Sequence, residues 1–203
     1  FGSLSQDNAA WTSLPTGTAS VAMAGVGKVQ TQAGADITLS GNNSAFAGLF
    51  QIDNDATLQA SQAENLGTAS IIDDGTLIFN NGQDWTLANT VTGSGLAVKN
   101  GAGTLSVGSS MSDFSGTTQI AAGSLVVGEE GSESSELGGN VDVTNGGILS
   151  GTGTVAGVVN NAGIIAAYKA LTSLTGYGNS TGATQLNLGT LNNTGTVQLA
   201  GST

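Results

Sequence analysis

Residues 93–128 of the chain read GSGLAVKNGAGTLSVGSSMSDFSGTTQIAAGSLVVG. In this stretch, short apolar runs alternate with turns of small and polar residues, as in Val98-KNGAGT-Leu105 and Ile120-AAGS-Leu125. Runs of this length, rich in Val, Ile, Leu and Thr and bounded by Gly, Asn, Asp and Ser, predict short β-strands separated by turns. Helix is disfavoured, because glycine recurs throughout and each glycine inside a helix costs about 1 kcal/mol relative to alanine.

The same pattern has a second copy earlier in the chain. Residues 25–52 align without gaps to residues 93–120 at an offset of 68. A unit of this size is too small to bury its own apolar face, so the copies are expected to stack on one another. The identical pairs are Gly25/Gly93, Gly27/Gly95, Ser44/Ser112, Phe46/Phe114, Gly48/Gly116, Gln51/Gln119 and Ile52/Ile120.

A finer period runs along the whole chain. Units made of a strand, a turn and a second strand recur with a mean spacing of about 23 residues. This period predicts an all-β, right-handed, single-stranded parallel β-helix of about nine coils over residues 1–203, with neighbouring strands roughly 4.8 Å apart. The units begin at Val29, Ile52, Ile72, Val98, Ile120, Val143, Val159 and Leu191.

The interior of such a β-helix is expected to hold columns of Val, Ile, Leu and Phe. Asparagines at Asn145, Asn160-Asn161 and Asn192-Asn193 are expected to stack as side-chain amide ladders in the turns. A β-sandwich or jelly roll is the competing architecture, because it also consists of short strands. It gives no reason for a self-similarity of about 23 residues, so the β-helix is favoured.

Two segments break the period. Residues 129–139, EEGSESSELGG, predict an exposed acidic loop, and residues 169–183, KALTSLTGYGNSTGA, predict a loop that interrupts the coil repeat. All 14 acidic residues lie at or before Asp142, so the first part of the chain is strongly acidic and the remainder nearly neutral.

Composition excludes several function classes. The chain has no Cys, no His and only three Lys or Arg residues, with a formal net charge of −11. It therefore lacks thiolate nucleophiles, a Ser-His-Asp triad and a histidine metal ligand. Nucleic-acid binding is not expected, because affinity for nucleic acid comes from neutralising phosphates. No apolar stretch approaches the ~20 residues of a spanning helix.

Residues 93–128 resemble the autotransporter-associated β-strand repeat. Its usual form runs G-x-L-x-K-x-G-x-G-x-L-x-L, then an aromatic residue, then G-x-T-x-I-x-x-G-x-L. Phe114 stands where Tyr is more usual, and residues 140–167 look like the continuation found in such proteins. The matching positions are Leu96, Lys99, Gly101, Gly103, Leu105, Val107, Phe114, Gly116, Thr118, Ile120, Gly123 and Leu125.

The resemblance implies a β-helical segment of a larger autotransporter passenger at the outer membrane and cell surface of a Gram-negative bacterium, or secreted from it. The implied partner is the C-terminal outer-membrane β-barrel of the same polypeptide. The implied function is a C-terminal stalk that helps the passenger to fold and to be secreted, and that displays an adhesive or autoaggregating region. The alternatives are direct binding of a host receptor, a glycan or a second copy, and, third, the stalk of a secreted protease or a polysaccharide-degrading β-helix enzyme.

Paired carboxylates are the main enzymatic candidates, since glycoside hydrolysis uses two carboxyl groups about 5–10 Å apart. Adjacent strand residues point to opposite faces, so Asp73 and Asp74 converge only if they lie in a turn. Asp-Asp-Gly is also an ordinary turn sequence. We therefore expect no enzyme, no catalytic residue and no cofactor.

Calcium and surface contacts are the remaining candidates. Asp53-Asn54-Asp55 and residues 129–136 offer oxygen ligands, but neither has EF-hand spacing, so no metal site is expected. Trp85 is expected in the core or as a cap of the stack. The expected contact surface consists of Tyr177, Glu129, Glu130, Glu133 and Glu136.

The inward columns have a direct test. Replacing Leu105 or Ile120 with Asp is expected to bury an uncompensated carboxylate and to abolish cooperative unfolding.

Overall fold

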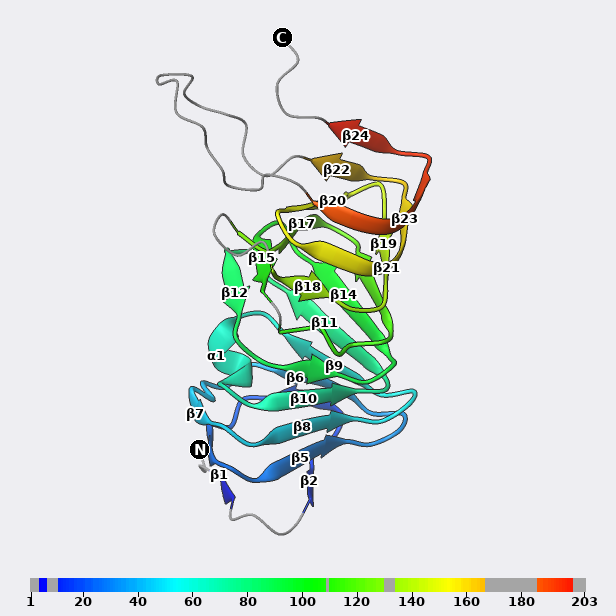
Figure 1. Cartoon of the computed structure of the whole chain (residues 1–203). Coiled ribbons are helices and arrows are strands. Elements are labelled where there is room, and N and C mark those ends of the chain that lie inside the picture. Colours follow the sequence, from blue (N-terminus) through cyan, green and yellow to red (C-terminus); the bar gives the residue numbers. More distant parts are fainter. Residues whose placement is uncertain (1–3, 7–10, 109, 130–133, 167–185, 199–203) are drawn as a thin grey trace, which may run out of the picture.

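The computed structural model describes residues 4–6, 11–108, 110–129, 134–166 and 186–198 of the chain. The secondary structure of these residues is nearly all short parallel strands, which stack into a β-solenoid, as Figure 1 shows. The strands form three walls, which we name first, second and third; the first wall ends at β13 (Val91–Thr92), and the described strands after it belong to the second and third walls. The predicted all-β parallel β-helix is confirmed.

The strands of each wall pair only with the same wall in the turns below and above. The first wall consists of β2 (Trp11–Ser13), β5 (Lys28–Thr31), β8 (Leu49–Ile52), β10 (Ser70–Asp73) and β13 (Val91–Thr92). The second wall consists of β3 (Gly17–Ala19), β6 (Asp36–Leu39), β9 (Thr57–Ala60), β11 (Thr76–Asn80), β14 (Leu96–Asn100), β16 (Thr117–Ile120), β19 (Asn140–Val143), β21 (Thr154–Asn161) and β23 (Asn187–Asn193), with β18 (Glu136–Leu137) beside β21.

The third wall is divided. Its N-terminal part consists of β1 (Leu4–Gln6), β4 (Met23–Gly25) and β7 (Ala45–Phe46), and its C-terminal part of β12 (Trp85–Leu87), β15 (Thr104–Val107), β17 (Gly123–Val127), β20 (Gly147–Gly151), β22 (Ile164–Ala166) and β24 (Thr196–Gln198). A short helix, α1 (Ala63–Leu66), stands between the two parts in chain order.

The number of turns is about seven, slightly fewer than the nine expected. The second wall carries nine successive rungs from β3 to β23, but α1 replaces a third-wall strand in one turn. In another turn the chain before β16 makes isolated bridges only. The period is also shorter than expected: along the second wall, Ile37, Leu58, Leu77 and Ala97 are register partners in steps of 19 to 21 residues.

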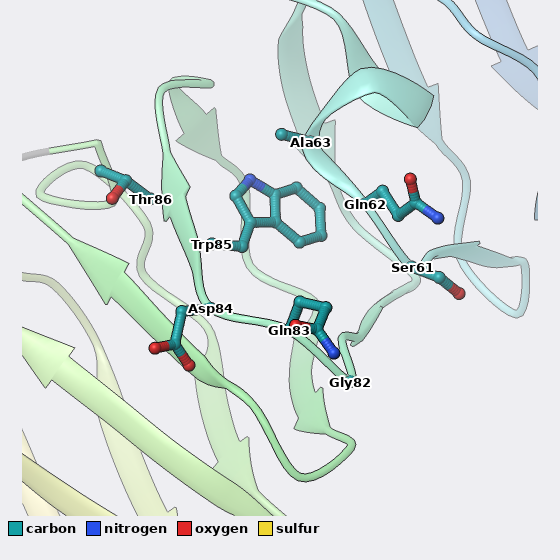
Figure 2. A pocket seen from close by; sticks show the side chains of 8 residues that line it. All are labelled: Ser61, Gln62, Ala63, Gly82, Gln83, Asp84, Trp85 and Thr86. Atoms are coloured by element: carbon teal, nitrogen blue, oxygen red, sulfur yellow. The ribbon is translucent and has the colours of Figure 1, made fainter.

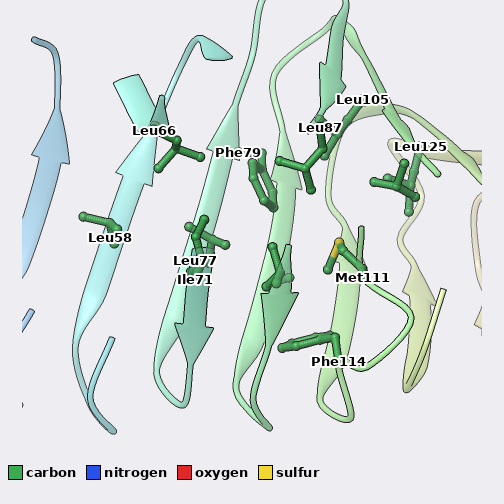
Figure 3. Close-up of a cluster of buried hydrophobic side chains, with 14 of the residues drawn as sticks. Leu58, Leu66, Ile71, Leu77, Phe79, Leu87, Leu105, Met111, Phe114 and Leu125 are labelled. Carbon is green, nitrogen blue, oxygen red and sulfur yellow. The ribbon is translucent and has the colours of Figure 1, made fainter. Parts of the chain in front are cut away.

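Alternate residues of each strand point into the solenoid and form the core. Leu58, Leu77 and Ala97 are stacked in register on the second wall, and each is fully buried. Figure 3 shows Leu58 and Leu77 on neighbouring strands, with Leu105 and Leu125 of the third wall in the same core. Burying such columns is the main source of stability, because a single turn cannot bury its own apolar side chains.

The repeat residues fall into two groups in the structure. Leu105, Val107, Phe114, Ile120 and Leu125 are all buried in the core, as the pattern requires. Leu96 is not, because β14 turns Ala97 and Lys99 inward and leaves Leu96 and Val98 partly exposed on the outer face. Leu96 is thus a repeat position that does not belong to the inward columns, because strand alternation places it on the outer face.

Gly116 and Gly48 show what the repeated Phe-x-Gly element does. A Cβ on Gly116 would meet the backbone carbonyl of Gly95 one turn below and lie 2.7 Å from the ring of Phe114. A Cβ on Gly48 would meet the carbonyl of Gly27 and lie 2.6 Å from the ring of Phe46. Each element therefore forms a corner at which only glycine allows the turns to approach so closely.

The two corners lie on different walls. Gly48 leads into β8 of the first wall, whereas Gly116 leads into β16 of the second wall. The offset of 68 residues between the sequence copies therefore corresponds to three turns and one further wall. The copies are equivalent in local corner geometry and not in their position around the solenoid.

Lys99 is the unexpected member of the core. Its side chain is fully buried in the second wall, with Phe79 and Ile120 as register partners. Its ammonium Nζ donates to the backbone carbonyls of Gly101 and Ala122, at 2.9 Å each. Ala122 belongs to the next turn, so this lysine joins two turns at one corner. Burial lowers the pKa of Lys99 from its ordinary value.

Substitution of Lys99 is expected to destabilise the stack in a graded way. Lys99→Ala removes the buried methylene chain as well as the hydrogen bonds and is expected to cost about 3 kcal/mol of unfolding free energy. Lys99→Met keeps most of the volume and is expected to lie between the alanine variant and the parent. Urea unfolding followed by circular dichroism measures both, with Val98→Met on the outer face of the same strand as the control. Equal midpoints for Lys99→Ala and the parent would contradict this role.

Asparagine side chains link successive turns at the corners. The predicted ladders at Asn160 and Asn161 are present, since Asn192 Nδ2 donates to Asn160 Oδ1 at 2.8 Å and Asn161 Nδ2 donates to Asn193 Oδ1 at 2.6 Å. Asn145 is exposed in the turn after β19 and does not join them. Sequence reasoning missed the buried side chains of Asn43, Asn65, Asn81 and Asn89, each of which donates to backbone carbonyls.

The two predicted interruptions have different outcomes. The acidic segment 129–139 is not a loop throughout, because β18 occupies Glu136–Leu137 and the side chain of Leu137 is fully buried. The second wall takes a step of 32 residues from Val159 to Leu191, as expected from an insertion at 169–183. Residues 169–183 themselves lie outside the described residues.

Candidate binding groove

The candidate site begins where the regular stacking of the third wall is broken. The helix α1 lies in the turn before β12, so β12 is the first strand of its sheet and pairs only with β15 above it. Asn65 holds the start of the helix, because its Oδ1 accepts the backbone N–H groups of Ser61 at 3.1 Å and Gln62 at 3.0 Å. Leu66, at the end of α1, is buried in the core.

A cleft of about 590 Å³ opens between α1 and β12. Figure 2 shows the Trp85 indole in this cleft, with Gln62 and Ala63 from the α1 side and Gln83 and Asp84 from the segment leading into β12. The lining residues are Ser61, Gln62, Ala63, Gly82, Gln83, Asp84, Trp85 and Thr86. The cleft exists because a helix of four residues fills less of the wall than a paired strand does.

Trp85 combines a core position with an unused donor. Its side chain is 6% exposed, packs edge-to-face on Phe79 with ring centroids 5.4 Å apart, and lies in register with Leu105. The indole Nε1 is buried and has no hydrogen-bond partner in the part of the chain that the structure describes. The expected core or cap position of Trp85 is confirmed, and the same residue also lines the cleft.

A second hollow of about 500 Å³ continues along the outer face of the third wall. It shares Asp84, Trp85 and Thr86 with the cleft, so the two hollows adjoin at β12, and we call them together the third-wall groove. Hydroxyl side chains dominate its floor. The further lining residues are Thr104, Ser106, Ser124, Val126, Glu129 and Ser150.

The hydroxyl groups of the groove are arranged by strand register. Thr86, Ser106, Val126 and Ser150 are register partners on four successive rungs, and Thr104 is paired with Ser124 beside them. Parallel rungs lie about 4.8 Å apart, so the groove presents two columns of small side chains at a fixed spacing.

The charge of the groove is negative. Asp84 and Glu129 are the charged residues among those that line it, and both are exposed. Asp84 is held in place, because its Oδ1 accepts the backbone N–H of Thr104 at 2.9 Å.

The carboxylate pairs considered for catalysis do not converge. Asp73 is fully buried at the end of β10, whereas Asp74 is exposed and its Oδ2 accepts the side-chain amide of Gln51 at 3.4 Å. Asp53 makes the equivalent contact one turn below, where Gln30 donates to its Oδ2 at 2.7 Å. The repeated amide–carboxylate contact gives Asp53 and Asp74 a role in holding neighbouring turns together.

Asp73 has an unusual environment for a carboxylate. Its Oδ1 accepts the backbone N–H of Gly75 at 3.1 Å, but its Oδ2 is buried without a partner among the described residues. Burial raises the pKa of Asp73 to about 7, against the lowering effect of the Gly75 hydrogen bond. No group of three or more potential metal ligands occurs within the described ranges.

The predicted contact residues are only partly covered by the structure. Glu129 is exposed at one end of the groove, and Glu136 is exposed on β18. Glu130, Glu133 and Tyr177 lie outside the described residues. The prediction of an acidic contact surface therefore overlaps the groove at Glu129, while sequence reasoning missed Asp84 and the hydroxyl columns.

Comparison with known proteins gives long relatives from one organism. The chain is 33% identical over 145 residues to the "Uncharacterized lipoprotein YdeK" of Escherichia coli (strain K12), which covers 71% of this chain and 11% of that protein. It is 41% identical over 104 residues to the "Uncharacterized protein YuaQ" of the same strain, which covers 51% of this chain and 8% of that protein. The chain thus spans about a tenth of the length of these relatives.

No protein-family profile matches the chain. No solved structure matches it either. Within the described ranges, no helix has the length and apolar character needed to cross a membrane.

Proposed function

We propose that this chain is a β-helical stalk segment of a Gram-negative surface protein of the autotransporter type. In this role it assists the folding and secretion of a longer passenger and holds an adhesive or autoaggregating region away from the cell. Its partner is the outer-membrane β-barrel of the same polypeptide.

The observation that carries the proposal is the second wall, in which nine rungs follow one another in parallel register. Each completed turn offers its strand edges and its apolar column as a template for the next turn. Folding can therefore advance turn by turn along the axis while the rest of the chain is still emerging, which is the property that a secretion-assisting stalk needs.

Two further findings support this proposal. Residues 93–128 carry the repeat pattern described above, and five of its apolar positions are buried core residues. The similar proteins belong to Escherichia coli, and the name of one of them describes a lipoprotein, which favours a membrane-associated or surface location for this chain in a Gram-negative bacterium. The proposal includes no catalytic step, because the candidate carboxylates Asp73 and Asp74 point to opposite sides of their strand end.

The folding role predicts a loss of secretion when the core is damaged within the full-length parent protein. Leu125→Asp buries a carboxylate in the third wall, where Leu125 is fully buried, and is expected to lower the amount of passenger at the cell surface several-fold. The amount is measured by protease accessibility and antibody labelling of intact cells. Ser124→Asp is the matched control, because Ser124 is the adjacent residue on the outer face of the same strand.

Surface display of Leu125→Asp at the parental level would overturn the folding role. The direct-binding alternative has a separate test, in which residues 169–183 are deleted and both adhesion and export are measured. Loss of export alone would assign the segment to the folding role, whereas loss of adhesion at normal export would favour direct binding through that segment.

A further inference from the structure

We propose that the third-wall groove binds an uncharged oligosaccharide. The site would be a binding site and not a catalytic one, and it extends from the cleft beside α1 across the rungs of β12, β15, β17 and β20. This inference does not depend on the proposed secretion role.

The shape of the groove fits a linear ligand. Two hollows of about 590 and 500 Å³ share Asp84, Trp85 and Thr86, so they adjoin at β12 and together extend over several rungs of the third wall. A rung spacing of about 4.8 Å is comparable with the length of one sugar ring in a chain. Successive rungs can therefore present the same type of contact to successive sugars.

The chemistry of the lining fits sugar hydroxyl groups. The side chains of Thr86, Thr104, Ser106 and Ser124 can each donate and accept a hydrogen bond, as a sugar hydroxyl can. Gln62 and Gln83 add amide donors and acceptors at the cleft end. Val126 also lines the hollow, but it is only 7% exposed, so the contacts offered to a sugar come from the hydroxyl and amide side chains.

Trp85 gives an independent indication of a ligand. An unpartnered buried donor costs free energy, so such a group in a folded protein calls for an explanation. The Nε1 of Trp85 is such a donor, in a side chain that is 6% exposed and lines the cleft. Nε1 itself is covered in this structure, so an oxygen acceptor from a ligand seated between α1 and β12 satisfies this donor only after a small shift of α1 or of the indole ring uncovers it.

The charge of the groove selects against anionic sugars. Asp84 and Glu129 flank the hydroxyl columns, and no lysine belongs to the lining residues. The chain as a whole carries a formal net charge of −11. Sulfated and carboxylated glycans would therefore meet like charges at Asp84, where the two hollows adjoin, and at Glu129, whereas uncharged sugars would not.

The test uses tryptophan fluorescence. Trp11→Phe removes the other of the two tryptophans, so that Trp85 alone reports on the cleft. Maltohexaose, cellohexaose and N-acetylchitohexaose are titrated as uncharged probes, and a heparin hexasaccharide as the anionic probe. A saturable change with at least one uncharged probe, and none with heparin, is expected.

Thr86→Arg in this background is expected to weaken binding at least tenfold, because Thr86 is exposed and lines both hollows. Thr38→Arg, on the outer face of β6 in the second wall, is the matched control and is expected to bind like the parent. Matching thermal melting curves for both variants would show that the loss is local.

Several outcomes would overturn the proposal. These are the absence of a response to all three uncharged probes, a response to heparin alone, or unchanged binding by Thr86→Arg. An alternating Thr-Val octapeptide tests the unpaired edge of β12 as a docking site for an extended peptide. Saturable binding of this peptide without sugar binding would replace the proposal with a peptide site.

Discussion

Leu105→Asp is expected to abolish the cooperative unfolding transition of the purified chain. Leu105 is 1% exposed, and its register partners on the neighbouring rungs are Trp85 and Leu125. A carboxylate at this position faces these two apolar side chains, neither of which compensates its charge. The cost of an uncompensated buried charge, several kcal/mol, is a large fraction of the roughly 5–15 kcal/mol that stabilises a typical domain.

Ser106→Asp is the matched control for this substitution. Ser106 is the next residue of β15 and points to the outer face, so the same carboxylate there remains solvated. Far-UV circular dichroism during a thermal scan distinguishes the two variants. A Leu105→Asp variant that melts at the parental midpoint would show that the inward columns of the third wall are wrongly assigned.

Ile120→Asp is expected to be less damaging, although the sequence pattern treats it as equivalent. Ile120 is the register partner of Lys99, so an aspartate at position 120 would be introduced beside a buried ammonium group. Attraction between opposite charges on neighbouring rungs offsets part of the desolvation cost. The difference between the two aspartate variants therefore reports on the position of Lys99.

The second large effect is expected in the pH dependence of stability, which Asp73 controls. The pKa of Asp73 is raised from 3.8 to about 7 in the folded protein, mainly by burial and in addition by the neighbouring carboxylate of Asp74. The side chain packs below Gly95, at which a Cβ would lie 2.8 Å from Asp73 Oδ1. Its strand partner Ile52 is apolar, so neither of these neighbours compensates the charge.

The sign of the effect follows from the direction of the shift. Between pH 4 and pH 7 the folded protein retains a proton on Asp73 that the unfolded chain has lost, so stability falls as the pH rises through this range. A shift of this size corresponds to about 4 kcal/mol, which is fully expressed above pH 7. The parent is therefore expected to be more stable at pH 5 than at pH 8.

Asp73→Asn is expected to remove most of this pH dependence and to raise stability at pH 8. The asparagine keeps an oxygen that can accept the Gly75 N–H, and it never ionises. Urea unfolding at pH 5 and pH 8 measures the effect; Asp74→Asn, which removes only the smaller contribution of the neighbouring charge, is expected to keep most of the pH dependence. If the parent and Asp73→Asn lose the same amount of stability between pH 5 and pH 8, the pH dependence comes from groups other than Asp73.

Much of the core was predictable from the sequence, because strand alternation and corner glycines leave a direct mark on it. Leu105, Ile120 and Phe114 lie at positions that repeat with the turns, and each is buried. Leu96 and Lys99 were assigned less well, because both faces of β14 carry aliphatic residues and the phase of the strand is not evident from the pattern. In the structure Lys99 is on the inward face of β14. Its ammonium group donates hydrogen bonds to backbone carbonyls of two successive turns, and this arrangement forms only when the turns are stacked.

The groove was not predictable for a different reason. It depends on the substitution of a strand by α1, and the four residues AENL carry no signal that distinguishes a single helical turn from an ordinary corner. One of its hydroxyl columns contains Thr86, Ser106 and Ser150. These residues are far apart in the sequence and are aligned only by the register of the paired strands. The exposure of Glu129 was predictable, because local acidity alone indicates a solvent-facing residue.

The 32-residue step between Val159 and Leu191 has a consequence for how such a chain can change over evolutionary time. After that step the strands resume their pairing, with Asn160 opposite Asn192 and Asn161 opposite Asn193. The stack thus prescribes the register of its rungs and leaves the length of a connecting turn open. New sequence can accumulate at a corner without any compensating change in the core, so a scaffold of this kind can acquire new surface segments one insertion at a time.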